Sequence, residues 1–237
     1  RTADLNIVVV GEQGARYMRG RTCGENRDRA NTTLLGLQEE LVRGVAASGK
    51  PTIMVVVAGR PQSIVWAEEN LPAILYAWEP GMYGGQAVAE ILYGEVNPSA
   101  KMSMTIPRNS GQIGIYYNHK PSHYFHKTLD QNPYPLYNFG YGLSYTEFEY
   151  SDLALSAEKI SADGTVEVEV TITNKGERDG VEIAQLYIRD CYSSATRPVK
   201  ELKDFARVEL KAGESKRVKF TITPDKLQFY NVDMERV

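Results

Sequence analysis

Apolar residues recur with two different periods along this chain, and the change falls near Phe148. Before it, short apolar runs rich in valine and isoleucine alternate with stretches of helical period, which is typical of parallel strands covered on both faces. After it, runs such as residues 165–173 alternate apolar and polar residues strictly, which is typical of antiparallel strands with one buried face. The pattern predicts an α/β domain followed by an all-β domain.

The first domain is predicted over residues 1–111. Strand-like runs occur at residues 5–10, 52–58 and 73–78. Helical patterns occur at 34–45, at 63–69, where Ser63 is placed to cap the helix, and at 87–92. A last strand is predicted near 101–106. Because strands that alternate with helices are joined by right-handed crossovers, we expect a mostly parallel sheet.

Residues 112–147 are rich in aromatic residues, proline and glycine and have no regular period. Since so many large rings would be left in water in a free linker, we expect an ordered connecting segment that packs between or across the domains. From 148 to 237, short strands with turns at 174–180 and at Gly213 predict an antiparallel, Ig-like β-sandwich without helices.

The composition excludes several classes of partner. A net charge of -3 over 237 residues gives no electrostatic reason to expect nucleic acid or an anionic membrane surface. No apolar run approaches the roughly 20 residues of a membrane span. Cys23 and Cys191 are the only cysteines, so no disulfide framework is indicated. The chain starts abruptly without a targeting segment, so we expect a piece of a longer polypeptide whose compartment the sequence leaves open.

The main candidate for chemistry is the charged loop Gly24-Glu25-Asn26-Arg27-Asp28-Arg29, after the first strand. Open α/β sheets bind ligands at the carboxyl ends of their strands, although a solvated charged loop is the simpler alternative. Glu25 follows a glycine and has charged neighbours that can orient it, as a general acid requires. Glu12 is the competing carboxylate; it can instead hold the loop by bonding backbone amides or one of Arg16, Arg19 and Arg21.

Three other patterns could indicate a functional site, but each lacks a feature that such a site requires. His119, His123 and His126 lie close together, but no helix places the first two on one face, so we expect no metal site. Cys23 has no base paired with it that would make it a nucleophile. Gly11-Glu12-Gln13-Gly14 lacks the glycine spacing of a nucleotide-binding loop, so we expect no cofactor.

Several motifs follow one another in a fixed order over nearly the whole chain. They are the strand end at 7–12 leading to the 24–29 loop, then Gly59-Arg60-Pro61, Ala77-Trp78-Glu79-Pro80-Gly81, Gly84-Gly85, and the stretches 92–99, 116–121 and 137–145. Together they resemble the C-terminal half of a glycoside hydrolase family 3 enzyme, the family of β-glucosidases and β-xylosidases.

The resemblance implies a three-layer α/β sandwich followed by a fibronectin type III-like β-sandwich. In this family an N-terminal (β/α)8 barrel carries the nucleophilic aspartate, and a loop of the sandwich domain carries the acid/base glutamate. The family's Gly-Glu-x-x-Asp-Arg pattern falls on Gly24, Glu25, Asp28 and Arg29. This match implies the acid/base role for Glu25, loop-supporting or substrate-binding roles for Gly24, Asp28 and Arg29, and a strand-end role for Glu12.

The implied activity is that of a retaining exo-acting β-glycosidase on terminal β-linked sugars of oligosaccharides or glycosides. We expect this chain to be inactive without a barrel partner and to lack the last strand of its β-sandwich. It departs from the family at Leu34-Leu35-Gly36, where Leu-Pro-Gly is common, and at Ser99-Ala100-Lys101, where Ser-Gly-Lys is common. A non-catalytic carbohydrate-binding or interaction module and a flavodoxin-like nucleotide binder stay as alternatives. The sequence specifies neither the sugar nor the oligomeric state.

Overall fold

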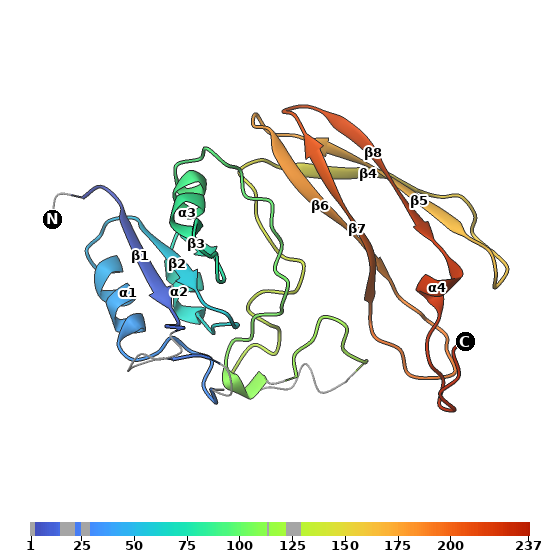
Figure 1. The fold of residues 1–237 in the computed structure, drawn as a ribbon, viewed down its shortest axis with the longest axis horizontal. Helices are drawn as coiled ribbons and strands as arrows, with labels where there is room; N and C mark the ends of the chain where they lie inside the picture. The colour runs from blue at the N-terminus through green and yellow to red at the C-terminus, as the bar shows by residue number, and fades with distance from the viewer. Residues whose placement is uncertain (1–2, 15–21, 25–28, 113, 122–128) are drawn as a thin grey trace. The chain divides into compact units, whose positions relative to one another are not determined.

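The computed structural model describes residues 3–14, 22–24, 29–112, 114–121 and 129–237 (Figure 1). They form two compact units. The first contains the described residues of Arg1–Tyr93, Met104–Ile115 and Phe125–Phe139, and the second those of Gly94–Ser103, Tyr116–Tyr124 and Gly140–Val237. The predicted connecting segment 112–147 is therefore shared between the units, and the predicted domain boundaries stay a prediction.

The first unit is built on a parallel sheet of three strands in the order β1-β2-β3, which agrees with the predicted α/β domain (Figure 1). The strands are β1 Asn6–Gly11, β2 Thr52–Val57 and β3 Ala73–Tyr76. The helices are α1 Gln38–Ala46, α2 Val65–Asn70 and α3 Gly84–Leu92, and a short 3-10 helix, η1, spans Ser110–Gln112. The apolar residues of β2 form the centre of the core, where Met54, Val55 and Val56 are almost fully buried.

Two predictions for this unit differ from the structure at the ends of helices. α1 begins at Gln38 and not at Leu34, because Gly36 has a left-handed φ of 59° that ends the turn before it. Ser63 does not cap α2, whose N-cap position is Ile64. The Ser63 hydroxyl donates instead to the carbonyl of Pro107, 3.0 Å away.

Two further differences concern strands. β1 is an edge strand of the described sheet, and among the described residues only its Val8 and Val10 face is buried, whereas Ile7 and Val9 are exposed. The strand predicted near 101–106 is absent. Residues 94–103 belong to the second unit, where the Met102 amide donates to the carbonyl of Tyr141 and its carbonyl accepts from the amide of Gly140, both at 2.7 Å. Only an isolated bridge joins Ile106 to Tyr137.

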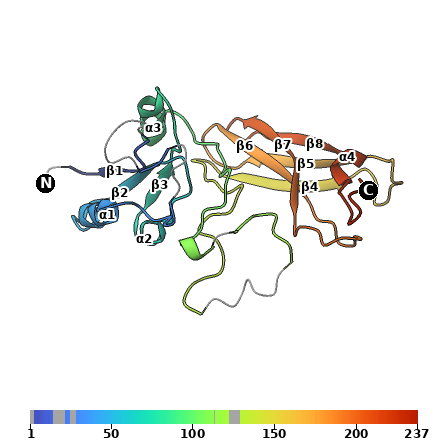
Figure 2. The ribbon, with the colours of Figure 1, turned by 60° about the horizontal axis from the view of Figure 1, so that its bottom comes forward.

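The second unit consists of antiparallel strands, as the strict alternation predicted (Figure 2). One sheet has the order β4-β5-β8 and the other pairs β6 with β7. The strands are β4 Phe148–Leu155, β5 Val166–Asn174, β6 Gly180–Ile188, β7 Glu201–Leu210 and β8 Ser215–Ile222. A four-residue helix, α4 Pro224–Leu227, was not predicted.

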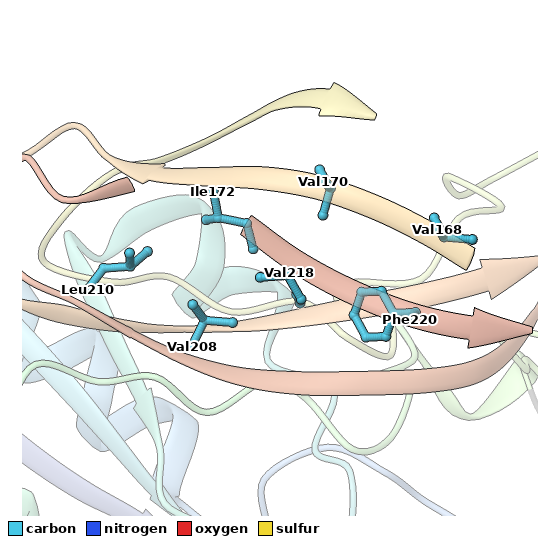
Figure 3. Packing of buried hydrophobic residues seen from close by; sticks show 8 residues of the cluster. Val168, Val170, Ile172, Val208, Leu210, Val218 and Phe220 are labelled. Atoms are coloured by element: carbon cyan, nitrogen blue, oxygen red, sulfur yellow. The ribbon is translucent and has the colours of Figure 1, made fainter. Parts of the chain in front are cut away.

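Alternate residues of these strands form one core between the two sheets. Figure 3 shows Val168, Val170 and Ile172 of β5 beside side chains from β7 and β8. The opposite face of β5 carries charge: Glu167 and Glu169 pair with lysine and arginine of β8. This division of apolar and charged residues fixes the register, since a slip of one residue would bury the charges. None of the described helices has the length and apolar character that a membrane crossing requires.

Candidate active site

The start of the candidate loop is held at the carboxyl end of β1. Gly11 has a φ of 141°, and a Cβ atom there would overlap the carbonyl oxygen of Val57, so the position requires glycine. The Gln38 side chain accepts from the amide of Gly11 at 2.7 Å and donates to its carbonyl at 2.9 Å. The amide of Glu12 then donates to Val57 at 2.9 Å. These bonds fix where the chain leaves the sheet.

A second pair of bonds closes the first part of the loop. The amide of Gln13 donates to the hydroxyl of Thr22 at 2.8 Å, and the amide of Thr22 donates to the carbonyl of Gln13 at 3.1 Å. Thr22 to Gly24 therefore start from a defined place beside the strand end, although residues 15–21 are outside the described residues.

The far end of the loop is held by a different set of contacts. Arg29 donates to Oε1 of Glu12 at 3.1 Å and to the carbonyl of Thr33 at 3.0 Å. Thr32 accepts from the amide of Ser63 at 2.8 Å, and its hydroxyl lies 2.7 Å from the Ser63 hydroxyl. Ser110 accepts from the amide of Thr32 at 3.0 Å. Residues 29–33 are thus bonded to three separate segments of the unit.

Glu12 is the centre of a buried ion cluster. Its side chain is 2% exposed, and each carboxylate oxygen has an arginine partner: Arg29 at Oε1 and Arg60 at Oε2, the latter through Nε at 3.0 Å. A buried carboxylate is stable only when its oxygens are paired in this way. The described partners of Glu12 are therefore Arg29 and Arg60. The predicted partners Arg16, Arg19 and Arg21 are outside the described residues, so the loop-holding role of Glu12 stays a prediction.

Glu25 and Asp28 are also outside the described residues, which stop at Gly24 and resume at Arg29. Gly24 has a φ of 143°, and a Cβ atom there would meet no described atom within 4 Å. Four residues join Gly24 to the anchored Arg29. The predicted site residues Gly24, Arg29 and Glu12 therefore belong to one loop whose two ends are held at the carboxyl edge of the sheet.

Two residues near this loop were missed by sequence reasoning. Arg60 follows β2 and Glu79 comes shortly after β3, so the ends of all three strands contribute a charged side chain to this edge. Glu79 lies against Gly59, where a Cβ atom would be 2.8 Å from its Oε1. The signal available in the sequence was the position of both residues just beyond predicted strands.

Cys23 is an unsuitable nucleophile here. Burial raises the pKa of its thiol, and the carboxylates of Glu12 and Glu79 raise that pKa further, against smaller opposing effects of Arg60 and Arg29. A thiol with a raised pKa stays protonated and unreactive at neutral pH.

The histidine pattern is only partly described. His119 has its Nδ1 2.9 Å from the carbonyl of Lys120, while His123 and His126 are outside the described residues. Across the described ranges, no three His, Cys, Asp or Glu side chains are grouped so that they could hold a metal ion.

Comparisons with known proteins agree with this architecture. The model of the glycosyl hydrolase family 3 C-terminal domain matches residues 1–145, and the model of the fibronectin type III-like domain matches residues 182–237. A beta-xylosidase of Formosa agariphila is 41% identical over 100% of this chain and 32% of its own length. A periplasmic beta-glucosidase of Salmonella typhimurium is 40% identical over 99% of this chain and 31% of its own length.

Solved structures of this kind also superpose on the whole chain. A beta-glucosidase from Listeria innocua in complex with glucose has a TM-score of 0.91 at 36% identity and is covered over 33% of its length. A b-glucosidase from Erythrobacter marinus has the same TM-score at 39% identity and is covered over 31%. The chain spans about a third of the length of these proteins. Sequence and structure together show that the chain belongs to glycosyl hydrolase family 3.

Proposed function

We propose that this chain is the acid/base-bearing part of a retaining exo-acting β-glycosidase of the β-glucosidase or β-xylosidase type, with Glu25 as the acid/base residue. The observation that supports this most is the buried Arg29 to Glu12 ion pair. It anchors the loop four residues after Glu25, at the strand edge where α/β sheets place ligands. The names of the relatives support the substrate class, a terminal β-linked glucose or xylose.

The proposed mechanism has two steps. In a retaining glycosidase, a nucleophilic carboxylate attacks the anomeric carbon while a carboxylic acid protonates the departing oxygen, and the resulting carboxylate then takes a proton from the attacking water. Glu25 would serve first as that acid and then as that base. The nucleophile would come from an N-terminal barrel domain of the same enzyme, with its carboxyl about 5 to 5.5 Å from Glu25. The proposal also includes the architecture of the first unit, which we propose to be a three-layer α/β sandwich.

The contacts at both ends of the loop support this role, because they limit how far the loop can move. An acid/base residue must be held within a fraction of an ångström of the leaving oxygen, and a loop achieves this only when its ends are fixed. Bonds from Gln38 and Val57 fix its start, and the Arg29 pair fixes its far end. Gly24 supplies a backbone conformation that other residues rarely adopt, directly before Glu25.

The test is to replace Glu25 in the full-length enzyme. Glu25→Gln should slow hydrolysis of substrates with poor leaving groups by roughly 100- to 10,000-fold and affect activated aryl glycosides much less, because only poor leaving groups need the proton. Glu25→Ala leaves room for azide, which should restore part of the rate on activated substrates and yield a glycosyl azide. Glu39→Gln, at an exposed carboxylate of α1, is the matched control. Azide rescue in Glu12→Ala but not in Glu25→Ala would refute the assignment.

A further inference from the structure

We propose that Arg60 is a positioning residue for this reaction: it holds Glu12, and through Glu12 it holds Arg29 and the loop that carries Glu25. The inference rests on the proposed function of Glu25. Arg60 is separated from Glu12 by 48 residues and comes from the turn after β2, so it ties the loop to a second strand end.

The geometry makes Arg60 part of the anchor. Glu12 is almost fully buried and carries one guanidinium on each oxygen. Without Arg60, Oε2 would lose a charge-assisted bond in a site with little water to replace it, and the carboxylate could rotate toward other donors. Because Oε1 is the oxygen that Arg29 bonds, any rotation of Glu12 also moves the anchor point of the loop.

Arg60 is itself held in place by the third strand. The hydroxyl of Tyr76, in β3, donates to the carbonyl of Arg60 at 2.7 Å and accepts from the amide of Gln62 at 2.8 Å. The Tyr76 ring also packs against Trp78, with the ring centroids 4.7 Å apart. A continuous path of contacts therefore leads from β3 through Arg60 and Glu12 to Arg29.

The direction of the hydrogen bond from Arg60 to Glu12 explains why position 60 needs an arginine. Nε of Arg60 reaches Oε2 while Arg29 occupies Oε1, so two planar guanidiniums divide one carboxylate between them. A lysine would keep the charge, but it presents a point charge on a flexible stem and would orient the carboxylate less strictly. The position thus requires a fixed direction as well as a positive charge.

The experiment measures how Arg60→Met and Arg60→Lys depend on the leaving group in the full-length enzyme. Arg60→Met should lower kcat/KM for a substrate with a poor leaving group by roughly 10- to 100-fold, because a misplacement of about 1 Å costs about that much. The loss for an activated aryl glycoside should be several times smaller. Arg60→Lys should show the same selectivity with a smaller loss. Azide should rescue neither variant, since Glu25 is still present.

The control is Arg43→Met. Arg43 lies in the same unit, forms an exposed pair with Glu39 and stacks over Trp66. Arg43→Met should therefore have the same small effect on kcat/KM for both substrates. If Arg60→Met does not fold, Arg60→Lys decides the question. An equal loss on both substrates, or no loss, would overturn the inference. If the Glu25 variants lack the leaving-group signature, the proposed function has failed; if they show it and the Arg60 variants do not, only the role of Arg60 has failed.

Discussion

The ion pair between Lys101 and Glu182 should contribute substantially to the stability of the second unit. Lys101 Nζ lies 3.2 Å from Oε2 of Glu182, and the hydroxyl of Tyr150 donates to Oε1 at 3.0 Å. Both side chains are largely removed from water, with 9% of Glu182 and 18% of Lys101 exposed. We therefore predict that Lys101→Met and Glu182→Gln each destabilise this unit, and that the two losses are not additive.

The magnitude follows from burial and distance. At 3.2 Å and an effective dielectric constant of about 20, the attraction is about 5 kcal/mol before the cost of desolvation. Removing one partner of a buried pair typically costs about 3 to 5 kcal/mol, because the other charge is left uncompensated. Since Lys101 keeps some contact with water, we expect about 2 to 3 kcal/mol for each single variant. The double variant should lose about 1 to 2 kcal/mol less than the sum.

Hydrogen exchange of the β6 amides, followed by mass spectrometry, is the suitable assay. Both tryptophans, Trp66 and Trp78, belong to the first unit, so tryptophan fluorescence does not report on the second. Lys219→Met is the matched control, because Lys219 pairs with Glu167 on the exposed face of the sheet and should cost less than about 1 kcal/mol. Equal losses for Lys101→Met and Lys219→Met, or additive losses in the double variant, would refute the reasoning.

Two further predictions concern titratable groups. Iodoacetamide should alkylate the exposed Cys191 much faster than the buried Cys23, whose pKa is raised, and peptide mapping that finds equal rates would contradict this. The hydrogen bond from Lys226 holds the pKa of Asp204 below its usual range, so this pair stabilises the fold above about pH 4 and its contribution is lost as the pH falls through the lowered pKa. Asp204→Asn should therefore lower stability modestly at pH 7 and progressively less as the pH falls below about 4, as equilibrium unfolding by denaturant over this pH range would show.

Local patterns in the sequence were sufficient to predict the helices and strands whose formation depends mainly on residues close to one another in the chain. Short apolar runs predicted β1, β2 and β3, and helical spacing predicted α3. Strict alternation predicted β5, because a half-buried strand needs its apolar residues on one side. The start of α1 was predicted wrongly at Leu34. The helical spacing of the leucines does not reveal that Gly36, between them, has a left-handed backbone conformation.

Contacts between distant residues could not be predicted in this way. Ser63 was predicted to cap the nearest helix, but its hydroxyl is hydrogen-bonded to the Thr32 hydroxyl and the Pro107 carbonyl, which belong to other segments. Residues 101–106 had the composition of a strand, but Met102 bonds to Gly140 and Tyr141, which are nearly forty residues away. Such choices depend on which segments the fold brings together, and local propensity does not contain that information.

The sequence by itself determined the two-part architecture and the place of the charged loop between β1 and α1, because both depend on apolar periodicity. Its motifs also identified the family and pointed to Glu25. Only the tertiary structure decided what holds the loop: Glu12 is paired with Arg29 at a separation of 17 residues and with Arg60 at 48. The physical reason is that a buried carboxylate must be paired, and which arginines can reach it depends on how parallel strands bring their carboxyl ends to one edge of a sheet.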